Sequence, residues 1–262
     1  MNERDRTLKA FGRLLDIMDA LREKCPWDRE QTIESLRPLT IEETYELSQA
    51  ILDRDHAGIA KELGDILLHI VFYAKIGSEL QTFSMEEVIE KLSEKLIYRH
   101  PHVFGERAVK DSGEVVENWE SLKMTEKDGN KSVLSGVPLG LPALIKAYRM
   151  QDKARAVGFD WEEKEQVWDK VAEELSEFRE EQKKKDASGM EAEFGDLLFS
   201  LVNAARLYGI NPETALELTN RKFIQRFSYL EQETIKKGRS LKEMSLAEMD
   251  EIWEQAKKPK HE

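Results

Sequence analysis

The stretch EETYELSQAILDRDHAGIAKELGD (residues 42–65) has a counterpart further along the chain, EELSEFREEQKKKDASGMEAEFGD (residues 173–196). Both begin with Glu-Glu-x-x-Glu and end with Glu-x-Gly-Asp, and they have equal lengths but largely different residues in between. A shift of 131 positions places the motif residues of the first stretch on those of the second. An acidic pattern repeated in this way indicates that a structural unit has been duplicated.

The repeat extends beyond the acidic pattern. After the motifs, GDILLHIVFYA matches GDLLFSLVNAA in character, and KLIYR (95–99) matches KFIQR (222–226). NWESLK (118–123) matches IWEQAK (252–257), so the elements recur in the same order. The segment between the copies is rich in Gly, Pro, Asp and Ser, which is typical of a linker. We predict a first repeat over residues 1–104, a linker with a short helix around Trp119 over 105–141, and a second repeat over 142–262.

Composition and periodicity predict an all-α fold. Charged residues make up 35% of the chain, and its many Glu, Lys, Leu and Ala residues favour helices. Apolar residues recur at spacings of three and four, as in residues 7–24, and no run alternates as a β-strand does. We expect helices near residues 7–24, 30–37, 40–54, 56–79, 85–99, 142–156, 163–186, 189–208, 212–236 and 245–257.

Net charge and cysteine content narrow the partners and the compartment. The formal net charge of −12 repels phosphodiester backbones, so we expect no direct nucleic-acid binding. Cys25 is the only cysteine, so no intrachain disulfide can form, which fits a reducing cytoplasm. The first residues lack an apolar signal-peptide core, and no window approaches the roughly 20 apolar residues of a membrane span. We expect a cytoplasmic protein with no membrane partner.

Helical spacing brings the motif carboxylates together. Glu43 and Glu46 are three residues apart, as are Glu62 and Asp65 on the following helix, so each pair shares one helix face. If the two helices pack antiparallel, four or five carboxylates meet in one place, Glu42 being the fifth. Because like charges repel, such a cluster requires a cation, and hard oxygen ligands suit Mg²⁺ or Mn²⁺.

A solvent-exposed helix face is the competing interpretation, because the chain contains 52 acidic residues. The second half-motif, the equal separation of the half-motifs in both copies and the duplication itself favour a metal site. The residues after each motif Asp are almost wholly apolar, which predicts that the acids stand at the end of a buried helical segment.

The motifs resemble those of the all-α nucleoside triphosphate pyrophosphohydrolases, and the fuller text resembles the MazG family in its two-domain form. The segments that carry the second resemblance are CPWDREQT, EETYEL, ELGDILLHIVFYA, RHPHVF, VGFDW, KFIQRF and a Trp-Glu pair near the end of the chain. Together they extend the resemblance over nearly the whole chain. The resemblance implies a duplicated four-helix-type domain in an intertwined homodimer. It also implies Mg²⁺-dependent hydrolysis of nucleoside triphosphates to monophosphate and pyrophosphate, with broad base specificity and a role in clearing nucleotides.

The implied chemistry suits the residues. A triphosphate is itself an anion, so an acidic pocket binds it only through metal ions, which also activate a water for attack on the α-phosphorus. The motif match assigns the metal ligands as Glu174, Glu177, Glu193 and Asp196, with Glu43, Glu46, Glu62 and Asp65 as their counterparts in the first repeat. The candidate catalytic carboxylates are Glu173, Glu174 and Glu193, one of which would orient or deprotonate the water.

Basic residues near these motifs are candidate nucleotide-binding residues. Lys222 and Arg226 are four residues apart on one helix face and could reach the triphosphate. A solvated basic pair is the alternative, but the pair recurs as Lys95 and Arg99. Lys170 precedes the second Glu pair by one turn and faces the nucleotide in the same interpretation.

Two further candidates for nucleotide binding are Trp253 and Asn203. Trp253 recurs as Trp119; core packing is the plainer role, and base stacking is the one that the family pattern favours. Asn203 could read a base edge, whereas the first repeat has Phe72 at that position. This difference, together with the basic run at residues 183–185, predicts that the second repeat does most of the hydrolysis, and the resemblance implies the same.

Other reactive side chains have structural explanations. His100 and His102 form a His-x-His pair that could bind a transition metal, but a turn that closes the first repeat explains them better. His69 lies on an apolar helix, as a core histidine does. Nothing near Cys25 marks it as a nucleophile.

Two other functions remain open. One is a narrower hydrolase of the dUTP or phosphoribosyl-ATP type, since the sequence does not determine the base. The other is a structural or regulatory helical bundle whose acidic sites only bind metal. A redox di-iron bundle would use Glu-x-x-His, and none of the five histidines has Glu three residues before it.

Overall fold

The computed structural model describes residues 1–106, 108–111, 113–115, 118–119, 122, 132–236 and 238–257. Every regular element in these residues is a helix, which confirms the all-α prediction. The chain divides into two compact units, Met1–Val109 and Lys110–Glu262, and the boundary falls within the predicted linker segment. The helix predicted around Trp119 lies mostly outside the described residues. No helix in the described part is both long and apolar enough to cross a membrane.

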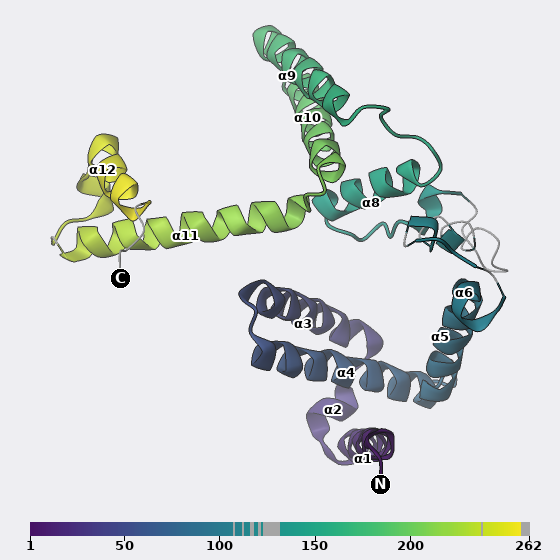
Figure 1. Cartoon of the computed structure of the whole chain (residues 1–262). Coiled ribbons are helices and arrows are strands. Elements are labelled where there is room, and N and C mark those ends of the chain that lie inside the picture. Colours follow the sequence, from purple (N-terminus) through teal and green to yellow (C-terminus); the bar gives the residue numbers. More distant parts are fainter. Residues whose placement is uncertain are drawn as a thin grey trace. The chain divides into compact units, whose positions relative to one another are not determined.

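The helices of the first unit are α1 (Glu3–Lys24), α2 (Pro26–Glu30), α3 (Ile33–Asp53), α4 (His56–Glu79), α5 (Met85–Arg99) and α6 (Pro101–Phe104) (Figure 1). The two helices predicted near residues 30–37 and 40–54 are one continuous helix, α3, with Pro38 inside it. Proline removes one hydrogen bond from a helix, and the packing of neighbours such as the buried Leu36 outweighs that loss. Residues 26–29 fall between the helices predicted at 7–24 and 30–37, and they form most of the short helix α2, because a proline fits the first helical position.

The second unit contains α8 (Ala143–Arg155), α9 (Val167–Lys184), α10 (Ala187–Leu207), α11 (Pro212–Lys236) and α12 (Leu246–Ala256) in its described residues. In the described residues, the 3₁₀ helices Lys164–Gln166 and Leu241–Glu243 lie between these helices, and a third, Leu134–Gly136, precedes α8. α9 and α10 pair along their length, and α8 packs against α10. α11 runs away from this pair and carries α12 at its far end (Figure 1).

The two acidic motifs lie on helical hairpins that turn in the same way. Arg54 follows α3 with a φ of 56°, and Lys185 follows α9 with a φ of 58°, so both adopt the left-handed conformation. The next residues, Asp55 and Asp186, cap α4 and α10 by accepting a hydrogen bond from the backbone N–H two residues on. The shift of 131 positions that relates the motifs also relates these turns. The duplicated sequence therefore produces a duplicated hairpin, with α3 against α4 and α9 against α10.

A tight apolar core joins α1, α3 and α4 in the first unit. Its buried members are Met18, Leu36, Val71, Phe72 and Ile76. Arg22 lies at one edge of this core, with its guanidinium 5.6 Å from the centre of the Phe72 ring. The same guanidinium is ion-paired with Glu79 and donates to the carbonyls of Asp28 and Gln31, so it ties α1 to α2 and to the end of α4.

Candidate active site

Carboxylates of the second motif gather where α9 and α10 meet. Glu174, Glu177 and Glu193 each place one carboxylate oxygen within 4.8 Å of the others. Burial raises the pKa of Glu193, and the neighbouring carboxylates, first Glu177 and then Asp196, raise it further. Asp196 is thus close to the cluster, although it is not part of the group of three. Crowded and partly desolvated carboxylates are the arrangement that a hard divalent cation stabilises.

The first unit contains the equivalent cluster between α3 and α4. Glu43, Glu62 and Asp65 place carboxylate oxygens within 4.8 Å of one another, with Glu46 outside the group of three. Burial raises the pKa of Glu43, and the charges of Asp65, Glu46 and Glu62 add to this effect. Glu62 is buried, and its Oε2 has no hydrogen-bond partner in the described part of the chain. Because an unpartnered buried oxygen is costly, a cation at this position would relieve it, and the donor set fits Mg²⁺ or Mn²⁺.

Each cluster is also contacted by a lysine, but from different elements. In the second unit, Lys170 Nζ lies 2.7 Å from Glu174 and 3.0 Å from Glu173 on the same helix. Hydrogen bonds to Glu174 and Glu173 hold the pKa of Lys170 above its usual value, so it remains an ammonium ion. In the first unit, Lys61 on α4 lies 2.8 Å from Glu62 and 3.6 Å from Asp65. The duplication therefore conserved the carboxylates but not the position of the cationic side chain.

A pocket of about 680 Å³ opens beside the second cluster, between α8, α9 and α10. Four residues singled out from the sequence line it, namely Lys170, Glu174, Asp196 and Asn203. Its other walls are largely apolar and include Phe159, Trp161 and Phe199. A mostly apolar pocket with a few polar groups and a carboxylate cluster at its edge is suited to a ligand with a flat apolar part and an anionic part.

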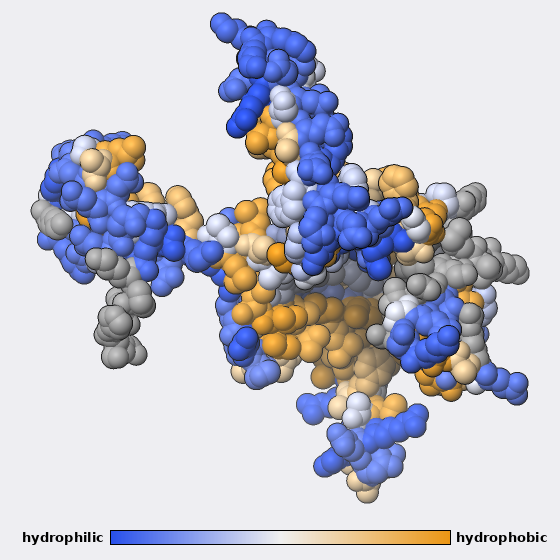
Figure 2. All heavy atoms as spheres, turned by 45° about the horizontal axis from the view of Figure 1, so that its top comes forward, coloured by the Kyte–Doolittle hydropathy of each residue, from blue (hydrophilic) through white to orange (hydrophobic). Residues whose placement is uncertain are grey.

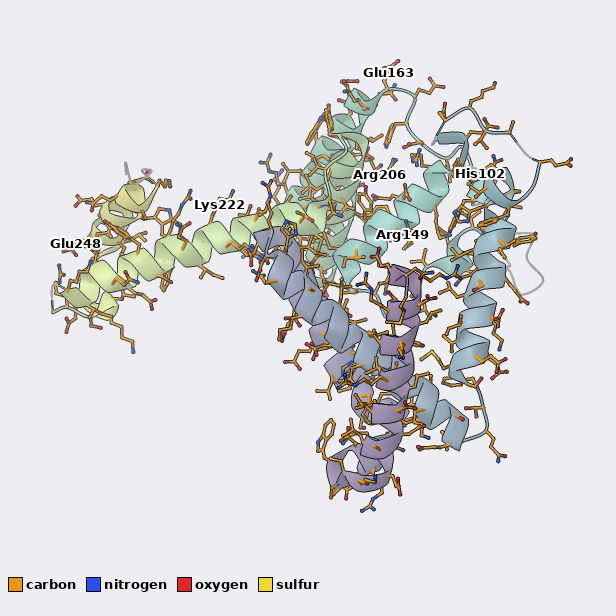
Figure 3. All side chains as sticks on the ribbon, turned by 60° about the horizontal axis from the view of Figure 1, so that its bottom comes forward. His102, Arg149, Glu163, Arg206, Lys222 and Glu248 are labelled. Atoms are coloured by element: carbon orange, nitrogen blue, oxygen red, sulfur yellow. The ribbon has the colours of Figure 1, made fainter. Side chains whose placement is uncertain are left out.

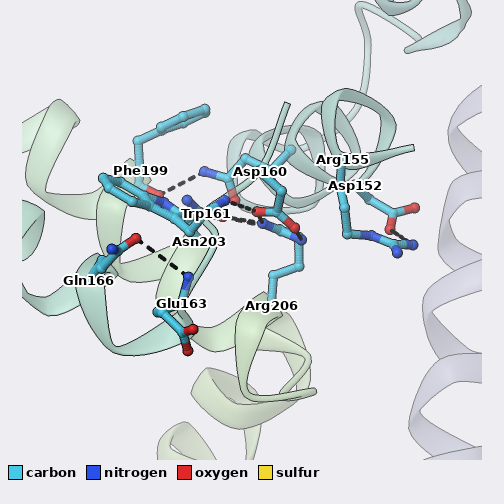
Figure 4. Close-up of polar contacts among 10 residues, drawn as sticks. Asp152, Arg155, Asp160, Trp161, Glu163, Gln166, Phe199, Asn203 and Arg206 are labelled. Atoms are coloured by element: carbon cyan, nitrogen blue, oxygen red, sulfur yellow. Dashed lines mark hydrogen bonds and ion pairs between the residues drawn. The ribbon is translucent and has the colours of Figure 1, made fainter. Parts of the chain in front are cut away.

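An ion pair and an amide form the polar wall of this pocket (Figure 4). Arg206 donates to both carboxylate oxygens of Asp160, one of these contacts being 3.0 Å long. The same guanidinium donates twice to Asn203 Oδ1, at 2.8 and 3.0 Å. Burial alone would raise the pKa of Asp160, but hydrogen bonds from Arg206 and from the Trp161 N–H outweigh it and hold the pKa below its usual value. Asp160 therefore stays ionised and fixes Arg206, which in turn fixes Asn203.

The first unit fills the corresponding region with apolar side chains. Phe72, which occupies the position of Asn203, is 2% exposed, and Met18 on α1 is 1% exposed. Both belong to the core described above. α1 packs on α4 as α8 packs on α10, but in the first unit this contact is a packed apolar core, whereas the second unit has a pocket there.

Three predicted nucleotide-binding residues lie away from this pocket within one chain. Lys222 projects from α11 and stands apart from Arg206 (Figure 3). Arg226 lies over the ring of Trp253, 5.9 Å from its centre, and Phe223 contacts the same ring at 5.2 Å. α11 and α12 therefore bring these residues together with one another but not with the carboxylates.

Two of the three lysines in the basic run at residues 183–185 are ion-paired within their own helix. Lys183 and Lys184 are ion-paired with Glu180 and Glu181, each at 2.6 Å. Lys185 is the left-handed residue of the turn. These pairs offset part of the positive charge of the run, so the expectation that the second repeat repels a triphosphate less rests mainly on Asn203 and stays a prediction.

Gln151, Asp160 and Arg206 are pocket residues to which the sequence analysis assigned no role. Asp160 lies within VGFDW, a match to the family, so the motif was a signal for it. Gln151 and Arg206 had no such signal, because a single polar residue on an amphipathic helix does not reveal whether it faces a pocket.

Comparison with known proteins gives consistent matches. The MazG nucleotide pyrophosphohydrolase domain matches the chain twice, over residues 31–104 and 162–230. The nucleoside triphosphate pyrophosphohydrolase/pyrophosphatase MazG of Thermotoga maritima is 47% identical over 251 residues, which cover 94% of this chain and 95% of that protein. The nucleoside triphosphate pyrophosphohydrolase of Escherichia coli K12 is 40% identical over 258 residues, or 96% and 98% of the two chains. An uncharacterized protein of Bacillus subtilis, YabN, is 47% identical over 241 residues, or 89% of this chain and 48% of that protein.

The fold and the site define an all-helical class of protein, in which paired acidic helices form a carboxylate cluster beside a pocket. With two domain matches and relatives that cover nearly its whole length, the chain belongs to the MazG nucleotide pyrophosphohydrolase family. It is accordingly an enzyme, a hydrolase that acts on acid anhydrides.

Proposed function

We propose that the protein hydrolyses nucleoside triphosphates to nucleoside monophosphate and pyrophosphate in a Mg²⁺-dependent reaction, with broad base specificity. The observation that carries this proposal is the cluster of Glu174, Glu177 and Glu193 at the edge of a largely apolar pocket. The pocket has room for a nucleoside, and the cluster suits the cations that accompany a triphosphate. The names of the relatives from Thermotoga maritima and Escherichia coli agree with this activity.

The residues of the second unit can be given roles in this reaction. Glu174, Glu177, Glu193 and Asp196 would hold Mg²⁺, which when bound supplies charge neutralisation and acidifies a water molecule. Glu173 is exposed beside the cluster and pairs with Lys170 at 3.0 Å, and from this position it would orient the attacking water or accept its proton. Lys170, kept charged by Glu174 and Glu173, is close enough to the pocket to contact a phosphate oxygen. Hydrolysis at the α-phosphorus then releases pyrophosphate as the leaving group.

The test is a turnover assay with the common ribo- and deoxyribonucleoside triphosphates, with and without Mg²⁺. We expect monophosphate and pyrophosphate as products, and loss of turnover when the metal is chelated. Release of diphosphate and orthophosphate would contradict attack at the α-phosphorus. Turnover of dUTP or phosphoribosyl-ATP alone would indicate a narrower hydrolase, and metal binding without any turnover would indicate a structural or regulatory bundle.

Exposed apolar stripes on both hairpins support a homodimer. Leu63, Leu67 and Ile70 on α4 are 37–52% exposed, although they follow the helical spacing of a packed face. The residues 131 positions further on, Phe194, Leu198 and Leu201 on α10, are 40–49% exposed. Figure 2 shows broad orange areas of such side chains at the surface. Because both copies expose the same stripe, we propose that each hairpin packs against the hairpin of a second chain.

The homodimer would also complete the active site. Lys222, Arg226 and Trp253 lie away from the pocket of their own chain, so we propose that α11 and α12 of a second copy bring them to the triphosphate. Several apolar residues of α11, such as Phe223 and Ile224, are more than half exposed, as expected for a helix that docks elsewhere.

The dimer is tested by light scattering at micromolar concentration, where we expect twice the mass of the chain. Leu198→Glu would place a charge in the proposed interface and should shift the protein towards monomer. Leu8→Glu is the matched control, because Leu8 is exposed near the start of α1 and belongs neither to the two stripes nor to α11. A wild-type monomer at this concentration would contradict the proposal.

A further inference from the structure

Gln151 on α8 is a buried pocket residue with one unmet hydrogen-bonding atom. Its side chain is among the lining of the pocket, and the residue is 7% exposed. Nε2 donates to the carbonyl of Phe199 at 2.8 Å, which fixes the orientation of the amide because a carbonyl oxygen could not donate. Oε1 is buried, and no described group donates to it. The side chain therefore holds an acceptor at the pocket whose partner is not supplied by the described residues.

Asn203 on α10 is fixed in a complementary way. Its Oδ1 accepts two hydrogen bonds from Arg206, which is itself held by Asp160 (Figure 4). Since a guanidinium only donates, the atom facing Arg206 must be the oxygen, and the amide Nδ2 faces away from it. Nδ2 makes no hydrogen bond in the described part of the chain and remains a donor. The pocket thus contains one fixed acceptor and one fixed donor.

We propose that Gln151 Oε1 and Asn203 Nδ2 read the hydrogen-bonding edge of the nucleobase, and this inference rests on the proposed nucleotide hydrolysis. Adenine and cytosine carry an amino group beside a ring nitrogen, and guanine and uracil carry a ring N–H beside a carbonyl oxygen. Every common base therefore offers a donor next to an acceptor. Amino and keto bases present these two groups in reversed order, so they would lie in the pocket in different orientations. Either kind can meet both Gln151 and Asn203, and a base that lacks the donor or the acceptor leaves one of them without a partner.

Reaching Gln151 requires a small adjustment of the pocket. Because Oε1 is buried in this structure, the side chains over it must shift before a base N–H can approach it. The unmet acceptor favours that shift, since the base supplies the missing hydrogen bond. A base without the N–H would leave the buried oxygen unpaired, and such a loss gives strong discrimination.

The experiment compares ATP with the triphosphate of purine riboside, which lacks the 6-amino group. In the wild-type enzyme we expect kcat/KM for ATP to be about tenfold higher, equivalent to about 1.4 kcal/mol. Gln151→Met keeps the length of the side chain but removes the acceptor. It should lower kcat/KM for ATP to the value for the analogue and leave the analogue unchanged. Gln49→Met, an exposed exchange on α3, is the matched control and should retain the wild-type ratio.

A second set of variants tests the positioning role of Arg206. Arg206→Met combined with Asp160→Asn removes both charges, which avoids leaving either one buried and unpaired. Asn203 is then free to turn its amide, so KM should rise several-fold for all four triphosphates with kcat unchanged. The lysine in Arg206→Lys can still donate to Asn203 and pair with Asp160, so this variant should have a KM close to that of the wild type. The contrary outcome is that kcat falls as much as KM rises in both the double variant and Arg206→Lys, and that both variants have a lowered Tm. That result would assign Arg206 a purely structural role and overturn its positioning role.

Binding measurements separate this inference from the proposed function. Calorimetry with AMP and with purine riboside monophosphate requires no hydrolysis, and the wild-type preference for AMP should disappear in Gln151→Met. An equal preference in both proteins would overturn the base-reading role even if triphosphates are hydrolysed. If no triphosphate is hydrolysed, the proposed function fails, and Gln151-dependent binding of AMP would still support the base-reading role.

Discussion

Glu193→Gln should abolish nearly all pyrophosphate release, whereas Glu62→Gln should retain most of it. The two residues occupy equivalent positions in equivalent hairpins, and each belongs to a cluster of three carboxylates. A pocket lies beside the cluster of Glu193, and Asn203 lines it; in the first unit Phe72, at the position of Asn203, is packed in the core. A triphosphate held by the first cluster would have no place for its nucleoside. We expect at least a roughly 100-fold loss for Glu193→Gln, since we propose it as a metal ligand and loss of a ligand costs more than loss of its supporting neighbours.

The assay compares both variants on the same triphosphates at saturating Mg²⁺. Glu191→Gln is the matched control, because Glu191 is exposed on α10 two residues from Glu193 and belongs to neither the cluster nor the pocket. Helical circular dichroism should be unchanged in all three. If each of Glu62→Gln and Glu193→Gln halves the activity, or if the order is reversed, the asymmetry is refuted although the enzyme assignment stands.

Exchanging the residues that distinguish the two hairpins should affect activity in one unit and stability in the other. Asn203→Phe brings the residue of the first unit into the pocket, where a phenyl ring would occupy the space of the base and remove the amide donor. We expect loss of nearly all turnover, with Mg²⁺ still raising the melting temperature because the carboxylates are untouched. Retention of wild-type KM and kcat would show that the nucleoside binds elsewhere.

The reciprocal exchange, Phe72→Asn, should destabilise the first unit. Phe72 is 2% exposed in the core and lies against Arg22, so the change leaves a cavity and buries an amide without partners. We expect a loss of about 3–5 kcal/mol in the free energy of unfolding. Urea denaturation followed by circular dichroism measures this, with the exposed Ile51→Asn as the control. A loss below about 1 kcal/mol would contradict the view that this region is a closed core.

The sequence was sufficient for the elements that depend on local pattern and on repetition. Apolar spacing predicted helices, and the repeated motif predicted two hairpins whose turns, at Arg54 and Lys185, have the same left-handed conformation. Spacing of three and four also placed Glu174 and Glu177 on one face, where the structure brings them to Glu193. Such features depend on residues that are close in the sequence, so they can be predicted without knowledge of the tertiary structure.

Where tertiary packing competes with local preference, the sequence was less informative. Two helices were expected near residues 30–37 and 40–54, but a single helix, α3, continues through Pro38, and Leu36 beside the proline is buried. The basic run at residues 183–185 suggested a positive field, but side chains one turn away on α9 neutralise Lys183 and Lys184. The electrostatic effect of a lysine on a ligand therefore depends on whether a carboxylate lies within ion-pairing distance of it.

By itself, the sequence determined that this protein is all-helical, duplicated and a member of the MazG family, with two sets of carboxylates at helical spacing. Only the tertiary structure decided what lies beside each set. α1 closes the first unit with Met18 against Phe72, whereas α8 meets α10 around Gln151 and Asn203 and leaves a pocket. The physical reason is that a helical pattern specifies which face of a helix is turned inwards. Whether that face meets a core or a cavity depends on the volume and polarity of side chains that are distant in the sequence.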